Sequence, residues 1–179
     1  MKNLTKVSVL REQLFNKTSR IERKSGIYCW WLKEEAAKIL LEKLHLTQGE
    51  FDKIQKRELE GENYWALYFG ISKDMLARAM WHITQRHSAS AVKHGVLSTL
   101  RQTFSALLGV DMSVSESKVD DFMNDNCYWE WEYNGNPIER QMEELVAQGC
   151  CYPLNIQENK TVSKVIRKEL IKLRKQYKK

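Results

Sequence analysis

GIYCWWL at residues 26–32 and YWALYFGI at residues 64–71 are the stretches from which the fold of this chain follows. Both are short and rich in aromatic and β-branched residues, which favours strands over helices. The second is apolar almost throughout, so we expect it to lie centrally in its sheet. A third stretch, CYWEWEY at residues 127–133, alternates aromatic and acidic residues, as is typical of a strand with one wet face. Together they predict a small, three-stranded, mainly antiparallel sheet.

The segments around these strands carry helical patterns. Apolar residues recur at three- or four-residue spacing, and capping residues or glycines mark several helix ends. The predicted helices cover residues 33–44, 51–59, 75–86, 97–108 and 138–148, and a C-terminal helix follows over residues 161–179. This order of strands and helices indicates an α+β domain in which helices flank the sheet.

We expect one domain with two short appendages. Of the 179 residues, 42% are apolar and 10% are aromatic, which is enough to bury a core and excludes a disordered chain. We interpret residues 1–24 as an N-terminal arm or helix and residues 25–160 as the domain, with a helical insertion at about residues 33–63. The C-terminal helix, residues 161–179, should pack on the domain through its apolar face.

The sequence also bears on the compartment. No apolar run approaches the roughly 20 residues that cross a bilayer, and the charged N-terminus lacks the apolar stretch of a signal peptide. The four cysteines, Cys29, Cys127, Cys150 and Cys151, lack the spacing of a zinc site. We therefore expect free thiols, no membrane partner and a cytoplasmic location.

The positive charge of the chain is concentrated at its C-terminal end. The chain has 29 basic and 23 acidic residues, a net charge of +6. Residues 160–179 contain nine basic residues and one acid, so they carry +8 and the other 159 residues carry −2. Such a helix is either a solvated charged face or an arm that binds phosphates.

Three short motifs link the predicted strands to a known family. Gly26-Ile27-Tyr28 begins the first strand, Tyr68-Phe69-Gly70 ends the second, and Arg78 follows Gly70 by eight residues. In this order the motifs resemble the GIY-YIG nuclease superfamily, with Phe69 in place of the usual isoleucine. His82 lies where many members have a histidine, and MEELV at 142–146 and PLN at 153–155 resemble the family's acidic helix and its Pro-x-Asn ending.

The resemblance covers about residues 25–160, and its main departure is the distance between the two tyrosine motifs. The chain has 39 residues between Tyr28 and Tyr68, where compact members have about a dozen. We interpret the difference as the insertion at residues 33–63, because long surface insertions cost little loop-closure entropy.

The resemblance implies an endonuclease that hydrolyses DNA phosphodiester bonds with a divalent ion, Mg²⁺ or Mn²⁺. It implies that Arg78 binds the scissile phosphate, that Tyr28 lies near the attacking water, and that Tyr68 and His82 complete the site. A glutamate of the late helix would hold the ion; Glu143 matches best, with Glu139 and Glu144 as alternatives. Further contacts to nucleic acid are expected from Lys73, Arg101 and Asn155 and, in the tail, from Lys164, Arg167, Lys168, Lys172 and Arg174.

Other interpretations stay open. Each tyrosine could be ordinary core packing, and Lys73, His82 and Glu143 could be ordinary surface residues. The chain could also be a nucleic-acid-binding module of this fold without catalysis, or an interaction protein that uses the insertion or the tail. The form of DNA, the choice between DNA and RNA, a role in repair, restriction or mobile elements, and the oligomeric state are not decided by the sequence.

Overall fold

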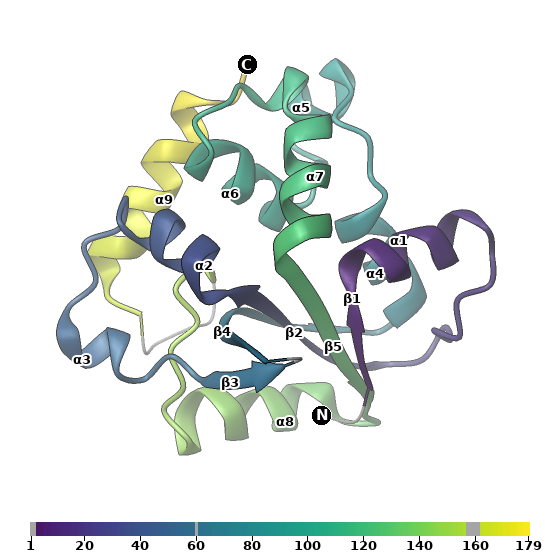
Figure 1. Ribbon diagram of the computed structural model, residues 1–179, viewed down its shortest axis with the longest axis horizontal. Coiled ribbons are helices and arrows are strands. Elements are labelled where there is room, and N and C mark those ends of the chain that lie inside the picture. The colour runs from purple at the N-terminus through teal and green to yellow at the C-terminus, as the bar shows by residue number, and fades with distance from the viewer. Residues whose placement is uncertain (1–2, 60, 157–161) are drawn as a thin grey trace.

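The computed structural model describes residues 3–59, 61–156 and 162–179, and these contain an antiparallel sheet with helices on both faces (Figure 1). The strand order is β1-β5-β2-β4-β3, with every neighbouring pair antiparallel. The three predicted strands are the central ones: β2 (Gly26–Lys33), β4 (Glu62–Ser72) and β5 (Cys127–Tyr133). The prediction of only three strands is wrong, because β1 (Asn3–Lys6) and β3 (Lys56–Leu59) extend the sheet at its edges.

The two edge strands lack the pattern that identifies a buried strand. Each has four residues, and none of these is fully buried. The predicted helix over 51–59 is accordingly wrong, since the capping box at Thr47 starts a helix that ends at Phe51 and β3 follows. Residues 33–63 therefore contain a strand as well as helices.

The remaining predicted helices are present with slightly different ends. Two parts of these predictions lie outside the described residues. They are residues 1–2, where the predicted arm begins, and residues 157–161, where the basic tail begins. The described helices are α1 (Val7–Phe15), α2 (Glu34–Leu41), α3 (Gln48–Phe51), α4 (Met75–Ile83), α5 (Ala89–Lys93), α6 (Thr99–Leu107), a 3₁₀ turn (Met112–Val114), α7 (Glu116–Asn126), α8 (Pro137–Met142) with a π-helical continuation (Glu143–Ala147), and α9 (Lys164–Gln176). Among the described residues, no helix is both long and apolar enough to span a membrane.

The sheet has a large core on one face and a smaller one on the other. On the first face, side chains such as Tyr28, Trp30 and Trp129 pack against most of the helices, including α4, α6 and α9. On the second face, residues such as Cys29 and Phe69 pack with Leu145 at the end of the helical segment that α8 begins, and with Tyr152 further on. Helix α8 is seen below the sheet in Figure 1. All four cysteines are buried free thiols, as predicted.

A β-bulge in β4 decides which side chains share the first face. Trp30 pairs with Tyr68, but its neighbour Trp31 pairs with Ala66, so Leu67 is the extra residue. A bulge reverses the alternation of side chains beyond it. Tyr68 and Gly70 therefore lie on the face of Tyr28, although an unbroken strand would put them on the other face.

The two tyrosine motifs pair directly, although 39 residues separate Tyr28 from Tyr68. Tyr28 lies opposite Gly70 in the register of β2 and β4. Both motif glycines sit where a Cβ atom cannot fit: at Gly26 it would lie 2.3 Å from the carbonyl oxygen of Glu132, and at Gly70 it would lie 2.3 Å from the hydroxyl of Tyr28. Glycine at 70 thus lets the second motif approach Tyr28 of the first, and glycine at 26 lets β2 lie against the backbone of β5.

Candidate active site

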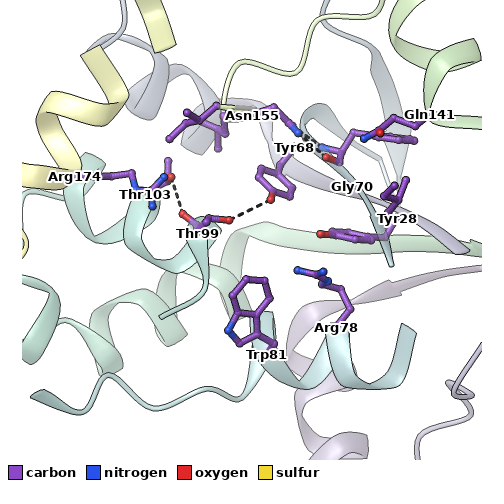
Figure 2. Close-up of a pocket in the computed structure, with 14 residues that line it drawn as sticks. Tyr28, Tyr68, Gly70, Arg78, Trp81, Thr99, Thr103, Gln141, Asn155 and Arg174 are labelled. Carbon is purple, nitrogen blue, oxygen red and sulfur yellow. Dashed lines mark hydrogen bonds between the residues drawn. The ribbon is translucent and has the colours of Figure 1, made fainter. Parts of the chain in front are cut away.

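A pocket of about 360 Å³ lies over the paired motifs, on the first face of the sheet (Figure 2). Strands β2 and β4, helices α4, α6, α8 and α9, and the segment after Tyr152 all contribute to its wall. The lining residues are Tyr28, Tyr68, Phe69, Gly70, Ile71, Arg78, Trp81, Thr99, Thr103, Gln141, Leu154, Asn155, Ile156 and Arg174. The structure thus brings four of the predicted site residues, Tyr28, Tyr68, Arg78 and Asn155, together with Arg174 of the basic tail.

Tyr28 is held by a chain of buried hydrogen bonds. Its hydroxyl lies 2.9 Å from Nε2 of His82, whose Nδ1 lies 2.6 Å from Oγ of Ser98. Burial raises the pKa of Tyr28 well above its ordinary value, and burial, with Arg78 and Arg101 nearby, lowers the pKa of His82 well below its own. Both side chains are therefore neutral at neutral pH. His82 lies behind Tyr28, outside the pocket lining, and is hydrogen-bonded to the pocket wall through the hydroxyl of Tyr28.

Tyr68 and Asn155 order the second motif. The ring of Tyr68 stacks beside that of Tyr28 with centroids 6.3 Å apart, and its hydroxyl lies 3.3 Å from Oγ1 of Thr99. The carboxamide of Asn155 accepts from the Phe69 N–H at 2.8 Å and donates to the Phe69 carbonyl at 2.6 Å. Asn155 therefore fixes the backbone of β4 directly before Gly70, and its place in the pocket wall follows from that role.

Two arginines enter the pocket from different helices. Arg78 of α4 is half-buried, and its guanidinium carbon lies 4.6 Å from the ring centroid of Trp81, one turn further on. Arg174 of α9 is also half-buried and donates from Nη2 to Oε1 of Gln102 at 2.7 Å. Within the described part of the chain neither arginine pairs with a carboxylate. The pocket is therefore a site of positive charge.

The helix that was expected to supply an acid presents an amide to the pocket. Gln141 of α8 is the residue that reaches the lining. Glu144 is buried among residues of the second face, where it accepts hydrogen bonds from Tyr152, Gln55 and Arg140. Glu143 and Glu139 are exposed, and Nη1 of Arg140 lies 3.8 Å from Oε2 of Glu143.

This donor set does not fit a magnesium ion. Magnesium in proteins is held through one or two carboxylates, and none of the described residues that line the pocket carries one. Across the described residues, no group of three or more histidines, cysteines and acids could hold a metal. The assignment of Glu143 as metal ligand thus stays a prediction from the sequence.

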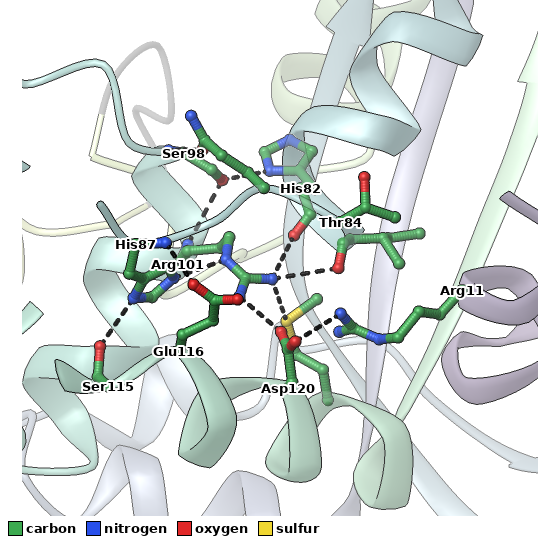
Figure 3. A network of polar contacts seen from close by, with 12 residues as sticks. Arg11, His82, Thr84, His87, Ser98, Arg101, Ser115, Glu116 and Asp120 are labelled. Atoms are coloured by element: carbon green, nitrogen blue, oxygen red, sulfur yellow. Dashed lines mark hydrogen bonds and ion pairs between the residues drawn. The ribbon is translucent and has the colours of Figure 1, made fainter. Parts of the chain in front are cut away.

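The prediction that Arg101 contacts nucleic acid is wrong, because its side chain is completely buried. It donates to Nε2 of His87 at 2.7 Å and to the carbonyl of His82 at 3.2 Å, and it pairs with Asp120 at 2.5 Å (Figure 3). Arg11 pairs with the other oxygen of the same carboxylate at 2.9 Å. Arg101 thus joins α6 to the end of α4 and to α7, which supports the helix that carries Arg78 and His82.

The buried histidines of this network predict a pH-dependent stability. Burial, with Arg101 nearby, lowers the pKa of His87 to about 4, and the pKa of His82 is lowered as well. In the unfolded chain both bind a proton near pH 6.5, whereas in the folded chain they stay neutral below that pH. The free energy of unfolding should therefore fall as the pH falls from 7 to 5, by about 2 kcal/mol for His87 and by a further amount for His82.

Urea denaturation at the two pH values measures this fall, and His87→Gln should make it smaller by about 2 kcal/mol. The exposed His94 provides the control, since His94→Gln should leave the pH dependence unchanged. An equal fall in the free energy of unfolding of wild type and His87→Gln would contradict the assignment of this pH dependence to His87.

The remaining predicted residues lie outside the pocket lining. Lys73 is exposed in a shallow groove that also contains Arg78 and Trp81. In the basic tail, Lys164, Lys168 and Lys172 are exposed and Arg167 is half-buried, and of the tail only Arg174 is among the described residues of the pocket wall. Sequence patterns did not identify Thr99, Thr103 or Gln141, because only packing brings these residues to the site.

Comparison with known proteins gave one kind of match. A family model described as GIY-YIG catalytic domain matches residues 26–176. This range includes both tyrosine motifs, Arg78 and the whole of α9. Neither curated proteins nor solved structures gave a match.

Proposed function

Because the chain belongs to the GIY-YIG catalytic-domain family, we propose that it is an endonuclease that hydrolyses phosphodiester bonds of DNA. The observation that carries this function is the convergence of Tyr28, Tyr68 and Arg78 in one pocket whose described lining has no acid. A nucleic-acid backbone is the abundant polyanion that such a site would bind.

Arg78 would bind the scissile phosphate. Its planar guanidinium offers paired donors that match two phosphate oxygens, and it cannot lose its charge at physiological pH. The contact with Trp81 holds the plane of the group, at 4.6 Å from the ring centroid. Arg78 can therefore stabilise the charge that develops on the phosphate during attack.

Tyr28 would position the attacking water. When the proton of His82 is on Nδ1, His82 donates to Ser98 and Nε2 accepts the phenolic proton of Tyr28. The phenolic oxygen then faces the pocket as an acceptor and can orient a water toward the phosphate held by Arg78. Because its pKa is raised, Tyr28 orients the water without first losing its own proton.

GIY-YIG nucleases generally depend on a divalent metal ion. No step above is assigned to such an ion, because the pocket lining has no carboxylate among the described residues. The presence of Gln141 in place of an acid also favours a second candidate, a nucleic-acid-binding module of the same fold that has lost catalysis.

A nicking assay separates the two candidates. Wild-type protein is incubated with supercoiled plasmid, and with branched and single-stranded DNA, in Mg²⁺ or Mn²⁺. We expect conversion of the plasmid to the nicked form. If the protein binds DNA but cleaves none of these DNA forms with either metal, the endonuclease activity is refuted and the binding module is supported. Glu143→Ala tests the predicted ligand: loss of nicking supports it, and unchanged nicking excludes it.

A further inference from the structure

We infer that Arg174 of α9 binds a second phosphate of the nucleic acid, next to the one at Arg78, so that the site accepts an internal linkage with its neighbouring phosphate. This inference rests on the proposed function of the pocket. It assigns a specific contact to one residue of the basic tail, in addition to the general attraction that the tail exerts on a polyanion.

The two arginines stand at opposite ends of one pocket. Figure 2 shows Arg174 entering beside Thr103 at one end and Arg78 lying below Tyr28 at the other. The hydroxyls of Tyr68 and Thr99 lie between them, 3.3 Å from each other. A run of hydroxyl donors between two guanidinium groups suits consecutive phosphates of one strand.

The guanidinium of Arg174 is hydrogen-bonded to a neutral side chain, and among the described residues it forms no ion pair. Its Nη2 donates to Gln102, and no other hydrogen bond to the guanidinium is found in the described ranges, so its remaining N–H groups can meet a ligand. Burial lowers the pKa of Arg174, opposed by Tyr68, and an arginine still keeps its charge at neutral pH. A partly desolvated cation without a counter-ion gains free energy when an anion binds beside it.

The helix around Arg174 is anchored, which distinguishes this residue from the solvated lysines of the tail. Ile166 and Leu170 are completely buried in the main core. The C-terminal end of the helix is tied down by Met112, whose N–H donates to the carbonyl of Tyr177 at 2.9 Å. Arg174 is therefore held in position before any ligand arrives, so less side-chain freedom is lost on binding.

Calorimetric binding of small nucleotides tests the inference without requiring cleavage. Thymidine 3′,5′-bisphosphate carries two phosphates at the spacing of a strand, thymidine 5′-diphosphate carries two phosphates in direct contact, and thymidine 5′-monophosphate carries one. We expect wild type to bind the 3′,5′-bisphosphate about tenfold or more tightly than either of the others.

Arg174→Met should remove this preference and leave the affinity for the monophosphate at Arg78 nearly unchanged. Arg174→Lys should recover part of it, because the charge returns without the planar fork. Lys175→Met, at an exposed position of α9 next to Arg174, is the matched control and should keep the preference. Equal preference in wild type and Arg174→Met, or an equal loss in Lys175→Met, would overturn the inference.

A measurement on the wild-type protein covers the case in which Arg174→Met does not fold. Phenylglyoxal modifies accessible arginines, and mass spectrometry locates the modified residues. The 3′,5′-bisphosphate should protect Arg174 more strongly than the 5′-diphosphate does, and equal modification of Arg174 with and without it would overturn the inference. If wild type prefers the 3′,5′-bisphosphate but never nicks DNA, the proposed endonuclease activity is refuted and this inference stands. If wild type nicks DNA but shows no such preference, the activity stands and this inference is refuted.

Discussion

Replacing Arg78 with methionine is expected to lower the rate of plasmid nicking about a thousandfold, with the fold intact. Arg78 is half-buried, and within the described residues it has no carboxylate partner whose charge its loss would strand. Methionine retains the aliphatic part of the side chain against Trp81, so the loss of stability should stay below about 1 kcal/mol. The rate of nicking and a thermal melt measure the two effects.

Two variants make the result for Arg78 specific. Lys73→Met removes an equal charge from the neighbouring groove and should change the rate by only a few-fold. Arg78→Lys keeps the charge without the planar fork and should recover only part of the rate. Nicking by Arg78→Met within tenfold of wild type would exclude Arg78 as the group that binds the scissile phosphate.

Gly70→Ala is expected to cost both activity and stability. The new Cβ would lie 2.3 Å from the hydroxyl of Tyr28 and 2.4 Å from Cζ, so the ring must move. The ring has little room to move. Tyr28 is 2% exposed, its hydroxyl is hydrogen-bonded to His82, and its ring centroid lies 5.7 Å from that of Trp129. We expect a loss of about 1–3 kcal/mol in the free energy of unfolding, as in other overpacked cores.

The accompanying loss of nicking should be about a hundredfold or more, since a small displacement of a positioning group has effects of this size. Gly49→Ala is the control, because no atom lies within 4 Å of the Cβ it would gain. Tyr28→Phe isolates the hydroxyl, because the ring stays in place. A Gly70→Ala protein with the melting temperature and rate of wild type would contradict the placement of Tyr28 over Gly70.

The central strands could be predicted because their signals are local. Residues 26–32, 64–71 and 127–133 are short and dense in aromatic side chains, and each is a strand buried on both faces over most of its length. The wet face expected for residues 127–133 is wrong, because Glu130 is buried. The same density was missing from Asn3–Lys6 and Lys56–Leu59, which add to the sheet by backbone pairing. Backbone pairing leaves little trace in a sequence, so edge strands of this kind escape prediction.

Charged residues were harder to assign, because sequence reports charge and not its surroundings. Arg101 and Arg174 are both arginines on amphipathic helices, yet one is buried against Asp120 and the other lines the pocket. Likewise, the acidic helix was expected to turn a glutamate toward the motifs, whereas Gln141 lies there and Glu144 is buried on the other face of the sheet.

By itself, then, the amino-acid sequence determined the three inner strands, the family motifs and their arginine, because periodicity and spacing along the chain carry that information. Only the tertiary structure decided that Tyr68 faces the same way as Tyr28, since one extra residue in β4 reverses the alternation. Packing likewise decided that α9 closes the pocket with Arg174. Contacts between distant segments depend on how whole faces fit together, and no local pattern specifies that fit.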